Sequence, residues 1–340
     1  MTAFADRLAS MPPASFAMVM ATGIVSIACQ LLGLPLVAVA LLLINVVLYV
    51  TLWALTVARA VRYRVRVVAD LTHHARAVGV FTIVAATSVL GSQALLVVGA
   101  WSVAAVCWVA GIGLWAIVTY TIFTALTIGV EKPSLAEGIN GGWLLPVVAA
   151  QSVAVLGAQL ASGFGSRAPL ALFFCLVLWL GGGMLYIWII SLIFYRYTFF
   201  PMSPSDLAPP YWINMGAVAI STLAGTLLAA AAPLSPLIQD LLPFIKGLTL
   251  LFWATATWWI PMLVILGAWR HVYRRFPLRY DPLYWGAVFP LGMYTVCTLR
   301  LAGMIDEPAL LLIPRVFLYV ALGAWALAFI GLLASFAKKP

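Results

Sequence analysis

The residues of this sequence best suited to chemistry lie in one apolar stretch, residues 284–303, which reads YWGAVFPLGMYTVCTLRLAG. It is about as long as a bilayer-spanning helix must be, roughly 20 residues. Pro290 lacks a backbone N–H and frees a carbonyl group at membrane depth, which protein or water must satisfy. Arg300 is a charge within a span, where arginine normally faces a bundle interior or an aqueous path. Helical spacing places Phe289, Gly292 and Arg300 on one side of the stretch.

This face carries a bulky aromatic ring, a thin glycine patch and a cation. One interpretation is the wall of a pore, in which Phe289 is a plug, Pro290 lets the helix bend and Arg300 attracts anions at the mouth. The other interpretation is a kinked packing helix whose arginine extends to the lipid headgroups. The stretch by itself leaves the two open.

The rest of the sequence offers no constellation typical of an enzyme or a resident metal. The histidines His73, His74 and His271 lie in basic segments, and the four cysteines lie inside apolar stretches. No HExxH motif and no P-loop is present. We therefore predict no catalytic residues, no metal ligands and no cofactor. An intramembrane enzyme and a non-transporting membrane scaffold are the remote alternatives.

Composition places the chain in a membrane. Of its 340 residues, 65% are hydrophobic and 8% are charged, whereas soluble proteins have about 25% charged residues. The net charge of +9 would suggest nucleic acid in a soluble chain, but here the basic residues fall between apolar stretches. We predict a multi-pass protein of the inner membrane whose partners are the lipid bilayer and a small solute, with no nucleic acid.

Ten hydrophobic stretches predict ten transmembrane helices in a single domain spanning residues 1–340. The stretches are residues 14–32, 36–60, 77–98, 101–128, 140–161, 169–195, 211–232, 246–269, 283–303 and 310–336. Taken in pairs, they form five helical hairpins: 14–60, 77–128, 140–195, 211–269 and 283–336.

The loops alternate in charge, which predicts the orientation. Most of the 18 Lys and Arg residues lie on one side, above all in residues 59–76 and 270–279 and at Lys338 and Lys339. Because basic loops stay on the cytoplasmic side, both termini are expected there.

The stretches alternate as well. The even-numbered ones hold most of the tryptophans, whereas the odd-numbered ones are rich in small and polar residues. Bulky aromatic surface suits lipid, and small residues suit helix contacts or water. We therefore expect five odd helices in a ring around a central pore, with five even helices outside them. Aligning the odd stretches on their starting aromatic residues gives candidates for the pore lining: Gly23, Ser88, Ser92, Gln151, Gly216 and Gly292.

Four segments carry a resemblance to a known family. They are MATGIVSIA (20–28), NGGWLLPVVAAQS (140–152), PPYWINMGAVAISTLAG (209–225) and RYDPLYWGAVFPLGMYTVCTLRLA (279–302). With them the chain resembles the tellurite-resistance/dicarboxylate transporter family, whose superfamily holds the fungal malate transporter and the plant slow-type anion channel. The resemblance implies five quasi-equivalent hairpins, a pore in each protomer, a homotrimer and a pore-blocking phenylalanine at a Phe-Pro step. That step is Phe289-Pro290 in this chain.

The resemblance implies anion transport but leaves the substrate open between a C4-dicarboxylate and a small inorganic anion. A coupled carrier often uses a titratable group within its spans. The odd stretches hold no mid-membrane Asp, Glu or His, which favours a channel-like mechanism. The alternative is a proton-coupled dicarboxylate or sulfite carrier.

Overall fold

A computed structural model describes residues 2–337 of the chain, with side chains for residues 5–336. In this part, nine helical segments are long and apolar enough to cross a bilayer. One of these, Gly141–Phe199, has 59 residues and contains two helices that pack against each other. The chain reverses between them at Gly165, whose φ of 54° and ψ of −126° are not helical. The predicted all-α fold with ten spans is therefore confirmed.

Five helices form an inner ring. They are α2 (Ala17–Leu31), α6 (Phe81–Val98), α9 (Leu145–Leu160), α11 (Ile213–Ala230) and α14 (Trp285–Ile305). Each packs against the next in chain order, and α14 packs against α2, which closes the ring. Most residues of these helices are buried, because small residues let the backbones approach closely.

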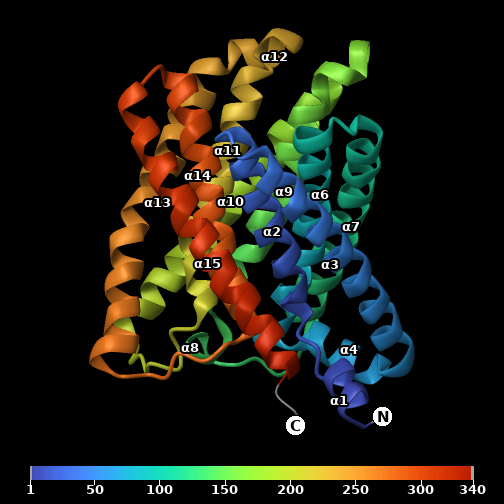
Figure 1. Cartoon of the computed structure of the whole chain (residues 1–340), viewed down its shortest axis with the longest axis vertical. Helices are drawn as coiled ribbons and strands as arrows, with labels where there is room; N and C mark the ends of the chain where they lie inside the picture. The colour runs from blue at the N-terminus through green and yellow to red at the C-terminus, as the bar shows by residue number, and fades with distance from the viewer. Residues whose placement is uncertain (1, 338–340) are drawn as a thin grey trace.

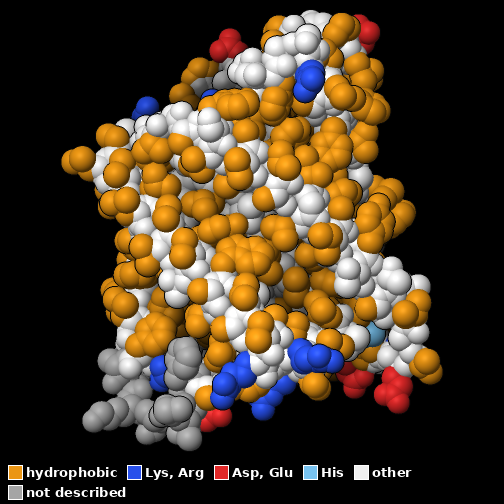
Figure 2. Space-filling model, turned by 90° about the vertical axis from the view of Figure 1, so that its right-hand side faces the viewer, with side chains coloured by type: hydrophobic (Ala, Val, Ile, Leu, Met, Phe, Trp, Pro, Cys, Tyr) orange, Lys and Arg blue, Asp and Glu red, His pale blue; other side chains and the backbone are white. Residues whose placement is uncertain are grey.

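Five helices form the outer layer. They are α3 (Pro35–Arg62), α7 (Trp101–Ile128), α10 (Ala168–Phe199), α13 (Leu242–Ala268) and α15 (Leu312–Ala337). Each packs against the inner helix that precedes it in the chain and against the next inner helix around the ring (Figure 1). Figure 2 shows hydrophobic side chains over the middle of the molecule, as expected of a surface that faces lipid.

The two ends of the molecule differ in their connections. At one end, which we call the far end, each inner helix is joined to the outer helix that follows it. In four of these five connections one residue has a positive φ: Gly33, Gly99, Gly165 and Asp306. Glycine adopts this conformation without steric cost, so these hairpins can be short. Gly165 lies inside the short helix η4 (Ala161–Arg167), and η9 (Pro308–Leu311) follows the turn at Asp306. The fifth connection is formed by η6 (Ala232–Leu234) and α12 (Pro236–Asp240).

Both termini lie at the opposite end, which we call the basic end because Lys and Arg side chains gather along it (Figures 1 and 2). Lys338 and Lys339 lie outside the described residues. Each inner helix starts there with a short 3-10 turn: η1 (Pro13–Phe16), η2 (Val78–Val80), η3 (Gly141–Leu144), η5 (Pro209–Trp212) and η8 (Pro282–Tyr284). The remaining elements at this end are α1 (Thr2–Ala9), α4 (Arg64–Thr72), α5 (His74–Ala77), α8 (Leu135–Gly138) and η7 (Trp269–Tyr273).

A repeated hydrogen bond ties the two layers together. Each outer helix donates from one side chain to the inner helix of the next hairpin. The five bonds are Asn45 to Gln93 (2.7 Å), Trp108 to the Val153 carbonyl (3.1 Å), Trp179 to the Ser221 carbonyl (2.8 Å), Trp253 to Thr298 (3.0 Å) and Trp325 to Thr22 (2.9 Å).

This corrects the expectation that the tryptophans of the outer helices serve as lipid-facing surface. The Trp179 ring is fully buried and the Trp259 ring is 2% exposed, although Trp188 and Trp258 do face outward. A buried indole N–H needs an acceptor, and in an apolar surrounding the acceptors lie on the neighbouring helix.

Candidate functional site

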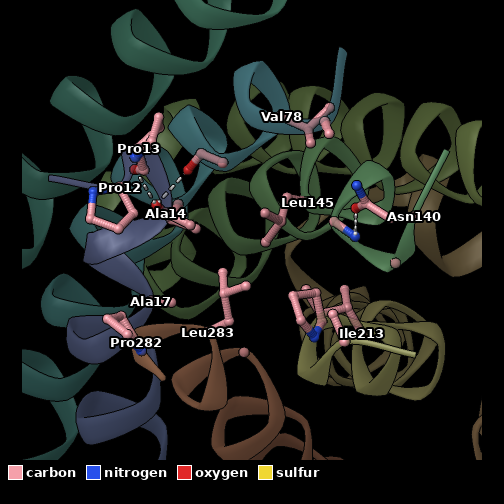
Figure 3. Close-up of a pocket in the computed structure, with 18 of the residues that line it drawn as sticks. Pro12, Pro13, Ala14, Ala17, Val78, Asn140, Leu145, Ile213, Pro282 and Leu283 are labelled. Atoms are coloured by element: carbon pink, nitrogen blue, oxygen red, sulfur yellow. Dashed lines mark hydrogen bonds between the residues drawn. The ribbon is translucent and has the colours of Figure 1, made fainter. Parts of the chain in front are cut away.

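A cavity of about 420 Å³, which we call the vestibule, opens at the basic end. All five inner segments contribute to its wall. Figure 3 shows Pro13, Val78, Leu145, Ile213 and Leu283, one from each segment, around a common opening. The vestibule therefore lies on the axis of the ring, where the first turns of the five inner helices meet.

One basic side chain lines the vestibule. The Arg76 Nε lies 2.7 Å from one carboxylate oxygen of Asp70, and the Arg59 Nη2 lies 2.7 Å from the other. Arg59 also donates to the backbone carbonyl of Ala9. This cluster fixes α3 and α4 against the N-terminal segment and partly neutralises Arg76.

Two acidic side chains line the vestibule, and both are engaged locally. Asp281 accepts a hydrogen bond from the backbone N–H of Leu283 at the start of η8 (2.8 Å). Asp206 accepts one from the backbone N–H of Ser203 (2.9 Å), which is the main reason that its pKa is lowered; the Arg196 guanidinium, 3.6 Å away, adds to this. The vestibule thus carries both signs of charge and no strong bias.

A second cavity, the axial cavity, continues along the ring axis toward the far end. Its volume is about 20 Å³, room for about one water molecule. Every inner helix contributes to its lining, at spacings of three and then four residues. The lining forms three layers: Ile24, Val89, Ser152, Ile220 and Met293; Ile27, Ser92, Val155, Leu223 and Val296; and Leu31, Leu96, Gln159 and Arg300.

Phe289 lies close to both cavities. It lies one turn before Met293 of the axial cavity, lines the floor of the vestibule and is 1% exposed. Met20 holds the equivalent position on α2 and is also 1% exposed. Helical spacing assigns Ala85, Val148 and Gly216 to the same layer on the other inner helices. These three residues are smaller than Phe289 and Met20, which leaves room for the large Phe289 ring in this layer.

The axial cavity is mainly apolar but has a polar side. Ser92 is 3% exposed, and its hydroxyl has no hydrogen-bond partner in the described part of the chain. The Oε1 atom of Gln159 is likewise unpaired there, whereas Ser152 donates to its own helix at Ala149. Arg300 stands at the far end of the same lining and is its one charged residue among those described.

Two of the residues predicted from the sequence line this cavity, Ser92 and Arg300, and Phe289 lines the vestibule next to it. Pro290 is buried behind Phe289 inside α14. A Cβ at Gly216 would come within 2.7 Å of the Pro290 ring, so Gly216 is the point at which α11 fits against α14.

The other predicted lining residues point between helices and line neither cavity. Gly23 lies under Asn45 and Val89, and Gly292 lies against Ile24 and Val25, with no room for a larger side chain. Gly23 and Gly292 are therefore not part of the axial lining. The same is true of Ser88 and Gln151.

Ser88 lies against Gly111 of α7, and the amide of Gln151 donates to the Trp179 carbonyl of α10 (3.0 Å). Ser88 comes one residue before Val89, and Gln151 comes one residue before Ser152; Val89 and Ser152 both line the axial cavity. One residue turns a helix by about 100°, which moves a side chain from the axis to a neighbouring helix.

Sequence reasoning missed Met20, Ser152 and Gln159. The signal that could have found them is the spacing of Phe289, Met293, Val296 and Arg300 on α14. Counted from the starting aromatic residue of each stretch, the same spacing gives the axial lining directly on α2, α6 and α11, and one residue further along on α9.

Comparisons with known proteins agree with this architecture over nearly the whole chain. A family profile described as voltage-dependent anion channel, SLAC1, matches residues 10–333. An uncharacterized membrane protein of Mycobacterium tuberculosis is 40% identical over 151 residues, 44% of this chain and 75% of the relative. An uncharacterized transporter of Methanocaldococcus jannaschii is 26% identical over 83% of this chain and 82% of its own length. A sulfite efflux pump of Arthroderma benhamiae is 24% identical over 93% of this chain and 88% of its own.

Proposed function

Because the chain belongs to the SLAC1 family of voltage-dependent anion channels, whose members are transporters or channels and not enzymes, we propose that it moves anions along the axis of its inner ring. The observation that carries this proposal is the axial cavity with Arg300 as its one charged lining residue. A cation in a narrow, low-dielectric passage raises the local concentration of anions and repels other cations.

The helix ends add to this preference at the basic end. The N-termini of all five inner helices meet at the vestibule, and their partial positive charges favour anions within the first turn. The C-termini lie at the far end, where their partial negative charges oppose anions. Arg300 lies in the last turns of α14 and counters them there.

Phe289 is the gate in this proposal. Its ring occupies the axis between the two cavities, and movement of the ring would join them. Pro290 supports such movement, because its missing N–H leaves the Gly286 carbonyl without a helical donor and weakens α14 at this turn. Selection then depends on pore width and positive potential more than on a tight binding site.

For the substrate we propose a C4-dicarboxylate or a small inorganic anion; tellurite resistance would then follow from movement of an oxyanion. The relative named as a sulfite efflux pump supports a small oxyanion. The second candidate is a proton-coupled carrier of dicarboxylate or sulfite. The axial lining favours the facilitative mechanism, because its described residues include no carboxylate and no histidine.

We also propose that the basic end faces the cytoplasm of an inner membrane and that the protein forms a homotrimer. The distribution of Lys and Arg supports the orientation. Labelling of single cysteines placed at Arg64 and Arg315 from the outside of intact cells tests it: label at residue 64 would reverse the assignment. Native mass spectrometry in detergent tests the trimer, and a purely monomeric protein would contradict it.

The gate is tested by anion flux into proteoliposomes, measured for chloride, nitrate, sulfite, malate and succinate. Phe289→Ala should raise the flux of the transported anion about tenfold or more by opening the axis. Phe252→Ala is the control, because this buried ring packs against Trp179 away from the axis. A folded Phe289→Ala protein that conducts no better than the wild type would show that Phe289 is not the gate.

A further inference from the structure

A third cavity, the far-end cavity, lies beside the outer mouth of the ring between α11, α13 and α14, next to the end of α2. Its volume is about 560 Å³, which suits a small organic ligand. Two cationic side chains line it, Lys246 and Arg300, and no acidic side chain is among its described lining residues. Arg300 also lines the axial cavity, so the two cavities share a wall at this residue.

Lys246 lies near the start of α13. It stands in the second turn of α13, which starts at the far end with Leu242. Helix α13 packs closely against α11 but meets α14 along a shorter stretch. This leaves a gap between α13 and α14 that Lys246 borders from one side and Arg300 from the other.

The other residues that line the far-end cavity offer no charged partner to Lys246 and Arg300. Leu31, Leu227 and Leu299 are apolar, and the Thr226 hydroxyl donates to the carbonyl of Leu223 in its own helix. The nearby acidic residue Asp306 is outside the lining. In the described part of the chain, neither Lys246 nor Arg300 forms an ion pair within 4.0 Å.

We propose that the far-end cavity is an anion-binding site in which Lys246 and Arg300 together hold a soluble dianion, such as a dicarboxylate, at the entrance to the axial cavity. Two separated cations in a cavity of this size favour an anion with two charged groups over a chloride-sized one. This inference rests on the proposed function for the role of the site in transport. Dianion binding itself can be measured without transport.

The binding test uses the purified full chain in neutral phosphatidylcholine nanodiscs. Succinate should raise its thermal unfolding temperature more than acetate does at equal ionic strength, because a ligand that binds the folded state stabilises it. In Lys246→Gln the succinate concentration for half of this effect should rise about fivefold. Arg315→Gln is the control, because Arg315 is exposed on α15 and lines neither cavity. An equal response in Lys246→Gln and Arg315→Gln would overturn the proposal.

A lipid phosphate could use the same two cations, so the measurement is repeated in nanodiscs that contain phosphatidylglycerol. A succinate effect that persists supports a soluble dianion as the occupant. An effect that disappears there and returns in neutral lipid assigns the site to lipid headgroups and overturns the soluble ligand.

A flux measurement separates this inference from the proposed function. In right-side-out vesicles, Lys246→Gln should raise the half-saturating concentration of external succinate and leave the maximal rate unchanged. If Phe289→Ala opens the pore but Lys246→Gln changes neither binding nor half-saturation, the site is wrong and the pathway stands. If succinate binding depends on Lys246 but no anion crosses, the site stands and the proposed function is wrong.

Discussion

At the scale of single residues, the layer that holds Phe289 combines five residues of very different size. Phe289 and Met20 are large and buried, whereas Ala85, Val148 and Gly216 hold the equivalent register positions and are smaller. In the proposed mechanism, one aromatic residue among smaller neighbours closes the axis, and a single side chain has to move to open it.

Arg300 gives the prediction at this scale. Arg300→Ala should reduce anion flux and lower the anion-to-cation permeability ratio about three- to tenfold, because the one charge in the axial lining is lost. Arg300→Lys should restore most of the ratio, since it keeps the charge. The ratio comes from reversal potentials across a salt gradient with purified protein in planar bilayers. Equal ratios in the wild type and Arg300→Ala would remove Arg300 from the mechanism.

At the scale of helices, the ring is held by bonds that cross from each outer helix to the next hairpin. Asn45, Trp108, Trp179, Trp253 and Trp325 supply one donor each. Hydrogen bonds between membrane helices contribute modestly, about 0.6 kcal/mol on average. The five bonds, one for each outer helix, oppose rotation of the helices that they join, and so they also help to set which face each inner helix presents to the axis.

Trp253→Phe tests this arrangement, because it keeps most of the ring and removes the N–H that Thr298 accepts at 3.0 Å. We expect a loss of about 1 kcal/mol in the free energy of unfolding, measured by denaturation in mixed micelles. Trp258→Phe is the matched control on the same helix, since the Trp258 ring is 56% exposed. A loss in the control as large as in Trp253→Phe would mean that ring packing, and not the hydrogen bond, stabilises the layer.

At the scale of the whole molecule, the charges are arranged differently at the two ends. The vestibule at the basic end holds Arg76, Asp206 and Asp281, whereas Arg300 and Lys246 stand at the far end without an acidic side chain in either lining. This distribution compensates for the helix ends, because helix N-termini meet at the vestibule and helix C-termini at the far end.

The same distribution predicts how transport depends on pH. No histidine lines the vestibule or the axial cavity in the described part of the chain. The pKa of Asp206 is lowered by the Ser203 hydrogen bond, so its carboxylate stays ionised and stabilises its loop until the pH falls below the ordinary aspartate range. Between about pH 6 and 8, flux of a fully ionised anion should therefore change by less than about twofold.

The measurement is flux of nitrate into proteoliposomes at fixed membrane potential, with and without a proton gradient. The control is protein-free liposomes under the same gradient. Accumulation of the anion that is driven by the proton gradient would contradict the facilitative mechanism and favour the coupled carrier.

Several features of this protein could be predicted from local sequence. Hydropathy determines the ten spans, because a bilayer needs about 20 apolar residues in a row whatever the partners are. The small residues of α2, α6, α9, α11 and α14 indicate the inner layer, since only they permit close helix contact. The stripe from Phe289 to Arg300 also follows from helical spacing alone. Phe289 lines the vestibule, and Met293, Val296 and Arg300 line the axial cavity.

What only the tertiary structure decided is the rotation of each helix. Gly23, Ser88 and Gln151 are suited to a pore by type, yet they contact Asn45, Gly111 and Trp179 on outer helices. A shift of one residue rotates a helix by about 100° while leaving its length, hydropathy and composition the same. That rotation is fixed by the partners a helix meets across the ring, and those contacts join residues that are far apart in the chain.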